Sequence, residues 1–94
     1  MNQALDSISI LGAGSWGTTI ALILAKKKQF KVTLWSPFSD QVEKMRALRR
    51  NSIFLPEACI PKDINITASI TEALGSNVIA IALPLSVRAF SITC

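Results

Sequence analysis

Three glycines near the N-terminus, Gly12, Gly14 and Gly17, follow the spacing G-x-G-x-x-G. An alternating apolar run over residues 7–11 precedes them and apolar residues at helical spacing follow, so the motif joins a predicted strand to a predicted helix. Gly12 is expected to make the tight turn, Gly14 to let a pyrophosphate approach the backbone, and Gly17 to let the helix pack closely on the strand. The N–H groups at the helix start, with that of Ser15 foremost, would bind the phosphates. The alternative is a glycine-rich turn without a ligand.

The sequence contains few other residues of the types that act in catalysis or bind metals. The 94 residues include no histidine, which removes His-based acid–base catalysis and disfavours a transition-metal site. Cys59 and Cys94 lie far apart and form no C-x-x-C pair, so we expect them to be reduced bystanders in an intracellular protein.

Composition and charge narrow the class of protein further. Half of the residues are hydrophobic (50%), yet no apolar run approaches the roughly 20 residues of a membrane span. The N-terminus lacks the pattern of a secretory signal, so we expect a cytoplasmic protein with no membrane partner. The formal net charge is +4, but the basic residues 26–28 and 46–50 fall at two predicted helix ends, where cations offset the helix dipole. A solvated role is therefore expected for them, and no nucleic-acid partner.

Strand patterns alternate with helix patterns along the whole chain. Strands are predicted over residues 7–11, 31–35, 64–68 and 78–83. The last run is uninterrupted apolar, which is typical of a parallel strand covered on both faces, and Pro84 ends it. Right-handed crossovers predict an α/β fold, a Rossmann-type doubly wound parallel sheet with four strands seen of a larger fold. Its first and fourth strands are neighbours, which places residues 12–17 and Pro84 on two sides of one cleft.

The helix between the second and third strands is predicted from its cap and its apolar face. Ser39 or Asp40 can cap it, and Glu43 is placed to complete a capping box with Asp40. Its apolar face would consist of Val42, Met45 and Leu48.

A short third helix is predicted to begin with the capping box Ser69 to Glu72 and to end at Gly75. A further helical pattern starts at Ser86 and reaches no cap before Cys94. The sequence therefore predicts a truncated or partial chain.

Four segments in order resemble the N-terminal domain of NAD(P)-dependent glycerol-3-phosphate dehydrogenases. They are GAGSWGT at 12–18, VTLW at 32–35, FLP at 54–56 and ALP at 82–84. The resemblance implies an enzyme that interconverts sn-glycerol 3-phosphate and dihydroxyacetone phosphate with NAD or NADP, feeds phospholipid synthesis and forms a homo-oligomer when complete. In this family the catalytic lysine and the substrate-phosphate contacts lie in later regions. For residues 1–94 the resemblance implies a partial N-terminal NAD(P)-binding domain without the C-terminal substrate domain. It is a cofactor half-site with no catalytic residue and no turnover.

The end of the second strand leaves the choice of cofactor open. Dinucleotide-binding domains commonly carry there an Asp or Glu for a ribose 2′-OH, or an Arg for a 2′-phosphate. Ser36 and Phe38 follow that strand instead. Ser36 could hydrogen-bond either group, and without an acid nothing there repels NADP.

Aromatic residues and one proline complete the candidate site. Trp16 could contact the cofactor or anchor the first helix, and Phe38 and Phe54 could face an adenine or pack within loops. Topology and resemblance together place Pro84 near the nicotinamide. The residues predicted to bind NAD or NADP are Gly12, Gly14, Ser15, Trp16, Gly17, Ser36, Phe38, Phe54 and Pro84, and no metal site is predicted.

Two other functions stay open. One is a different oxidoreductase with the same nucleotide domain, of the hydroxyacid, sugar-nucleotide or ketopantoate type, which would not be expected to carry Trp35 and the segment 54–56. The other is a non-catalytic nucleotide-binding remnant, which would bind adenosine phosphates without chemistry.

Overall fold

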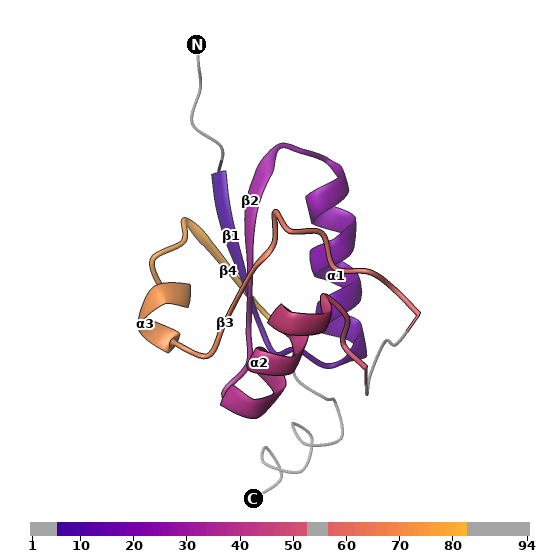
Figure 1. Ribbon diagram of the computed structural model, residues 1–94. Coiled ribbons are helices and arrows are strands. Elements are labelled where there is room, and N and C mark those ends of the chain that lie inside the picture. Colours follow the sequence, from indigo (N-terminus) through magenta and orange to yellow (C-terminus); the bar gives the residue numbers. More distant parts are fainter. Residues whose placement is uncertain (1–5, 53–56, 83–94) are drawn as a thin grey trace, which may run out of the picture.

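The computed structural model of the chain describes residues 6–52 and 57–82, so the predictions for Phe54, Pro84 and the segment after it lie outside the described residues. Four strands form one parallel sheet in the order β3-β2-β1-β4 (Figure 1). Their bounds are β1 Asp6–Leu11, β2 Phe30–Trp35, β3 Asn65–Thr67 and β4 Val78–Ile81. The predicted α/β fold and the pairing of the first strand with the fourth are confirmed.

Three helices connect the strands: α1 Ser15–Lys26, α2 Ser39–Leu48 and α3 Ile70–Ala73. Figure 1 shows α1 and α3 on opposite sides of the sheet, as a doubly wound fold requires. On the α3 side the Ser9 hydroxyl is buried and donates to the Ala73 carbonyl at 2.6 Å. On the α1 side the contacts are apolar.

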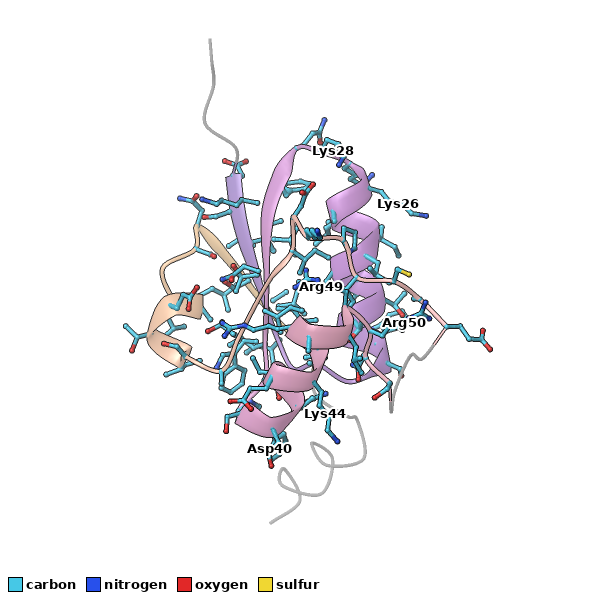
Figure 2. All side chains as sticks on the ribbon, in the orientation of Figure 1. Lys26, Lys28, Asp40, Lys44, Arg49 and Arg50 are labelled. Atoms are coloured by element: carbon cyan, nitrogen blue, oxygen red, sulfur yellow. The ribbon has the colours of Figure 1, made fainter. Side chains whose placement is uncertain are left out.

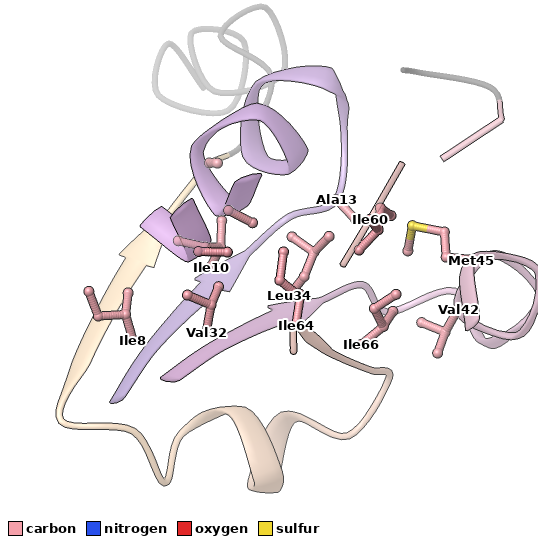
Figure 3. Packing of buried hydrophobic residues seen from close by; sticks show 13 residues of the cluster. Ile8, Ile10, Ala13, Val32, Leu34, Val42, Met45, Ile60, Ile64 and Ile66 are labelled. Carbon is pink, nitrogen blue, oxygen red and sulfur yellow. The ribbon is translucent and has the colours of Figure 1, made fainter. Parts of the chain in front are cut away.

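The core forms because alternate residues of the strands face α1 and α2. Ile8 and Ile10 of β1 lie in register with Val32 and Leu34 of β2, and Ile66 of β3 lies beside Leu34. All five side chains are buried, and Figure 3 shows them gathered in one layer. Burial of one such side chain contributes about 1.5–3 kcal/mol. The helices and loops add Ala13, Ala21, Ala25, Val42, Met45, Ile60, Ile64 and Ala82 to this cluster.

Strand β4 differs from its prediction, because the described residues do not cover it on both faces. Val78, Ile79 and Ile81 are 49%, 39% and 69% exposed. Within residues 6–52 and 57–82, β4 pairs only with β1, and Ala80 alone among its four residues packs against the buried cluster. An uninterrupted apolar run is typical of a strand that other elements bury on both faces, and the part of the chain that the structure describes does not bury β4 in this way.

Helix α2 differs from its prediction at both ends. It begins at Ser39, so Asp40 lies inside the first turn and cannot cap it, and the capping box with Glu43 is wrong. Phe38 occupies the N-cap position without a side-chain bond, and its N–H donates instead to the Ser36 hydroxyl at 3.2 Å. At the other end Leu48 is 57% exposed, because the helix stops there and the chain turns away through Arg49 in a left-handed conformation.

Two of the basic residues near the end of α2 also bond backbone carbonyls; Arg46 is exposed as predicted, whereas Arg49 is half-buried. Arg46 donates through Nε to the Ile66 carbonyl at 2.7 Å. Arg49 donates through Nη2 to the Ile64 carbonyl at 2.8 Å, and it also bonds the carbonyls of residues 60 and 61. These bonds hold α2 against the segment that enters β3, and Figure 2 shows Arg49 nearer the middle of the molecule than the lysines. Lys28 also matches the prediction, since it is exposed near the end of α1 in a solvated ion pair.

Helix α3 forms half of its predicted capping box. The Ser69 hydroxyl accepts from the Glu72 N–H at 3.2 Å, as predicted. The Glu72 carboxylate does not return to Ser69 but accepts from Asn65 Nδ2 at 2.6 Å and from Thr67 Oγ1 at 2.8 Å. These two bonds, that of Asn65 first, lower the pKa of Glu72 below its ordinary value. Gly75 follows the helix as predicted and donates its N–H to the Glu72 carbonyl at 3.2 Å.

Candidate cofactor site

The glycine turn connects β1 to α1 at the carboxyl edge of the sheet. Gly12 has a φ of 119°, in the region that favours glycine, and its N–H donates to the Trp35 carbonyl at 2.9 Å. A Cβ at Gly17 would lie 1.9 Å from the Gly12 carbonyl oxygen and 3.2 Å from the Ala82 Cβ. The tight turn at Gly12 and the close packing at Gly17 are therefore confirmed.

The N-terminus of α1 is open to a ligand. Gly14 occupies the N-cap position, and a Cβ there would meet nothing within 4 Å. The first N–H groups of a helix have no partner within the helix, and the helix dipole adds positive potential to them. No acidic residue lies in the first turn of α1, so no carboxylate of that turn offsets this potential. A phosphate group could approach the backbone here without a steric or electrostatic obstacle.

A cavity of about 790 Å³ lies against this turn. Ligand pockets commonly have volumes of about 300–1,000 Å³. The cavity is lined by the ends of β1, β2 and β4, by the glycine turn and by the first turns of the three helices. Its lining residues are Leu11, Gly12, Ala13, Gly14, Ser15, Trp16, Trp35, Ser36, Pro37, Phe38, Gln41, Ile70, Ile81 and Ala82.

The structure brings six of the predicted site residues together along this cavity. They are Gly12, Gly14, Ser15, Trp16, Ser36 and Phe38. Gly17 lies behind the turn and does not line the cavity, and Phe54 and Pro84 fall outside the described residues. The six residues come from two separate segments, which the pairing of β1 with β2 brings side by side.

Apolar side chains dominate the mouth of the cavity. Trp16 and Phe38 are 69% and 67% exposed, although aromatic side chains of this size usually bury most of their surface. Ile81 of β4 is exposed to the same degree. None of the described lining residues carries a charge. A ligand bound here would contact apolar side chains with its rings and backbone N–H groups with its anionic part.

Ser36 lines the cavity, but its polar groups already have partners in the protein. Its hydroxyl donates to Gln41 Oε1 at 2.6 Å and accepts from the Phe38 N–H at 3.2 Å, and its N–H donates to the Thr67 carbonyl at 3.1 Å. The side chain is buried. To donate to a ribose, the Ser36 hydroxyl would have to leave Gln41. Its contact with a ribose stays a prediction.

Sequence reasoning missed two amide side chains beside the glycine turn. Gln41 Nε2 and Asn51 Nδ2 both donate to the Ala13 carbonyl, at 3.0 and 2.7 Å. Asn51 Nδ2 also donates to Thr18 Oγ1 at 2.9 Å. In the sequence one residue stands inside a helix pattern and the other at the start of a loop. No local signal distinguished either of them, because their function depends on a contact with a distant segment.

The described residues lack two kinds of feature, a metal-binding group and a membrane-spanning helix. Within residues 6–52 and 57–82, no group of His, Cys, Asp or Glu side chains is arranged to hold a metal ion. The helices of the same residues include none that is long and apolar enough to cross a membrane.

The arrangement defines a class of domain. A glycine turn follows the first strand of a parallel sheet, a helix N-terminus faces a cavity, and the strand order changes direction at β1 between β2 and β4. Ligands of open α/β sheets bind at such a switch point, and this combination is that of a dinucleotide-binding domain.

Comparison with known proteins shows the family. Residues 7–92 match the family described as the NAD-dependent glycerol-3-phosphate dehydrogenase N-terminus, and the chain belongs to that family. It is 42% identical over 83 residues to a glycerol-3-phosphate dehydrogenase [NAD(P)+] from Geobacter sulfurreducens, covering 87% of this chain and 24% of the relative. The corresponding relative from Koribacter versatilis is 37% identical over 81 residues, covering 85% and 24%.

A solved structure agrees with the sequence comparison. The crystal structure of glycerol-3-phosphate dehydrogenase from Coxiella burnetii superposes with a TM-score of 0.79 at 43% identity, covering 85% of this chain and 25% of that chain. The chain thus spans about a quarter of the length of the relatives that it matches.

Proposed function

We propose that this chain binds NAD or NADP in the cavity at the glycine turn, as the cofactor-binding domain of a glycerol-3-phosphate dehydrogenase. The observation that carries the proposal is the open approach to α1, where a Cβ at Gly14 would meet nothing within 4 Å and no acidic residue lies in the first turn. The names of the relatives include NAD(P)+ and support the same cofactors.

The residues present fit two parts of a dinucleotide, the pyrophosphate and the adenosine end. Backbone N–H groups at Gly14, Ser15 and Trp16 would hold the pyrophosphate. Phe38 and the neighbouring Ser36 would flank the adenosine end. When bound, the cofactor would accept or donate a hydride, and the residues described here would orient it and shield it from water.

The remaining features of the activity rest on the family. The complete enzyme would interconvert glycerol 3-phosphate and dihydroxyacetone phosphate and supply a glycerophospholipid precursor in the cytoplasm. Phe54 and Pro84 would add contacts to the adenine and nicotinamide ends, and a homo-oligomer would be the working form. The family match supports this function over a hydroxyacid-type dehydrogenase.

Calorimetric titration of the 94-residue chain with NADH and NADPH tests the proposal. We expect saturable binding to the parent chain and none to Gly14→Val, whose side chain would occupy the space of the pyrophosphate. Gly75→Ala, at the far end of α3, is the control for removing a glycine and should bind like the parent. Equal binding by Gly14→Val and the parent would contradict the proposed site.

A turnover assay separates binding from catalysis. Hydride transfer from glycerol 3-phosphate needs an acid or base at the substrate hydroxyl and groups that hold its phosphate. The described cavity lining contains no charged side chain that could serve. We therefore expect the 94-residue chain to form no NADH above a protein-free control. NADH formation that Gly14→Val abolishes would show that the chain is itself catalytic.

A further inference from the structure

The carbonyl of Ala13 lies inside the glycine turn and accepts two hydrogen bonds from side chains of other segments. Gln41 Nε2 donates to it from α2 at 3.0 Å, and Asn51 Nδ2 donates from the following loop at 2.7 Å. A carbonyl has two lone pairs, so both are used. Asn51 is 1% exposed and directs its second N–H to Thr18 Oγ1 at 2.9 Å.

The orientation of both amides follows from their partners. The Ala13 oxygen can only accept, so an amide nitrogen must face it from each side. With Gln41 Nε2 facing Ala13, Gln41 Oε1 faces Ser36 and can only accept, so the Ser36 hydroxyl donates to it at 2.6 Å while it accepts from the Phe38 N–H. The resulting chain of hydrogen bonds runs from Phe38 through Ser36 and Gln41 to the Ala13 carbonyl.

The direction of that carbonyl determines where the next N–H points. A trans peptide is planar, so the Ala13 carbonyl and the Gly14 N–H point in opposite directions, and the described residues contain no cis peptide. The amides hold the carbonyl toward the protein interior, where Asn51 is buried. The Gly14 N–H is thereby directed away from Asn51, and Gly14 itself lines the cavity.

We infer that Gln41 and Asn51 are positioning residues, which fix the Ala13–Gly14 peptide so that the Gly14 N–H faces the pyrophosphate site. The inference rests on the proposed function and extends it. Ser36 acts in the same network: it holds Gln41 in place and, through the Phe38 N–H, links the adenosine side of the cavity to the phosphate side. The strength of phosphate binding thus depends on two side chains that need not touch the cofactor.

Binding of NADH to Gln41→Met tests the inference, because methionine keeps the length and helix propensity of glutamine but cannot donate. We expect its Kd to rise by about three- to tenfold, the range of one neutral hydrogen bond. Arg46→Met is the control on the same helix: it also removes a side-chain bond to a backbone carbonyl, the charge-assisted bond to Ile66 at 2.7 Å. Its Kd should stay within about twofold of the parent.

The double variant Gln41→Met/Asn51→Ala sharpens the test. Each single variant leaves one donor on the Ala13 carbonyl, whereas the double variant leaves none, so its loss of affinity should exceed the product of the single losses. If Asn51→Ala fails to fold, the comparison of Gln41→Met with Arg46→Met still decides.

A nuclear magnetic resonance readout distinguishes positioning from a general loss of stability. Ala13-Gly14 is the only Ala-Gly pair in the sequence, so carbonyl-¹³C alanine with ¹⁵N glycine gives one cross-peak for this peptide. We expect the peak to move in Gln41→Met, because the carbonyl loses a donor, and to stay in place in Arg46→Met. Partial unfolding would lower its intensity without moving it.

Two results would contradict the inference, and they differ from each other. If the parent binds NADH but Gln41→Met and the double variant bind it as Arg46→Met does, the positioning role is wrong and the proposed function stands. If the parent binds neither NADH nor NADPH, the proposed function is wrong and the inference fails with it.

Discussion

The two walls of the cavity are built in different ways. The wall at the glycine turn depends on the backbone, through the positive φ of Gly12 and the 1.9 Å that would separate a Cβ at Gly17 from the Gly12 oxygen. The wall at the end of β2 depends on side-chain hydrogen bonds among Ser36, Phe38 and Gln41. A single added carbon atom at the glycine turn should therefore disrupt the packing of that wall. Changes to the side chains at the end of β2 should have smaller, graded effects on cofactor affinity.

The largest effect is expected at Gly17. The Cβ of Gly17→Ala would collide with the backbone carbonyl of Gly12, which cannot rotate away as a side chain can. Overpacking commonly costs about 1–3 kcal/mol, and we expect a loss of about 3 kcal/mol or more in the free energy of unfolding. Urea denaturation measures it, with Gly75→Ala as the control, since a Cβ at Gly75 would lie 3.4 Å from the Glu72 oxygen. A change below about 0.5 kcal/mol at Gly17 would contradict the close packing.

Trp16 should affect affinity and leave stability alone. Its side chain is 69% exposed at the mouth of the cavity, so Trp16→Ala removes little buried contact. If an aromatic ring of the cofactor packs on it, affinity for NADH should fall by about 0.5–1.5 kcal/mol with the unfolding midpoint unchanged. Leu48→Ala, an exposed apolar residue outside the cavity lining, should change neither quantity. Unchanged affinity in Trp16→Ala would show that Trp16 does not contact the cofactor.

A charge at residue 36 tests the second wall. Two unit charges about 4 Å apart interact by about 1 kcal/mol in water, which corresponds to about fivefold in affinity. Ser36→Asp should therefore lower the affinity for NADPH relative to NADH by about fivefold or more. The ratio of the two Kd values isolates this repulsion from any loss of the bond to Gln41, which affects both cofactors alike. An unchanged ratio would place the ribose elsewhere.

The smallest effect is expected far from the cavity, at Glu72. Hydrogen bonds from Asn65 and Thr67 lower the pKa of the folded carboxyl below its ordinary value of 4.5. The stabilisation is therefore present above pH 4.5 and is lost as the pH falls through the folded pKa. Glu72→Gln should be less stable than the parent at pH 7, by under about 1 kcal/mol because the group is exposed, and equal to it in strong acid. A difference that does not change with pH would contradict the role of the carboxylate.

The two walls also differ in how well the sequence predicted them. Spacing and steric rules identified Gly12 and Gly17, because their requirements come from the backbone itself. The alternation of strand and helix patterns likewise predicted the parallel sheet and the pairing of its first strand with its fourth.

The remaining features depend on contacts between distant segments. Gln41 and Asn51 meet Ala13 only in the folded chain, and no local pattern marks them. Neither predicted cap, Ser39 or Asp40, caps α2, because the helix already begins at Ser39 with Phe38 at the N-cap position. The Phe38 N–H donates to the Ser36 hydroxyl. One such hydrogen bond can shift the boundary of a helix by a residue or two, and a sequence pattern does not show that bond.

The most direct test of the central claim is an amide spectrum of the ¹⁵N-glycine chain during titration with NADH. The chain has four glycines: Gly12 and Gly14 in the turn, Gly17 in the first turn of α1, and Gly75 after α3, which serves as an internal control. If the pyrophosphate binds at the N-terminus of α1, the Gly14 peak moves saturably while the Gly75 peak stays in place. A Gly14 peak that does not move at NADH concentrations that saturate binding would contradict the account.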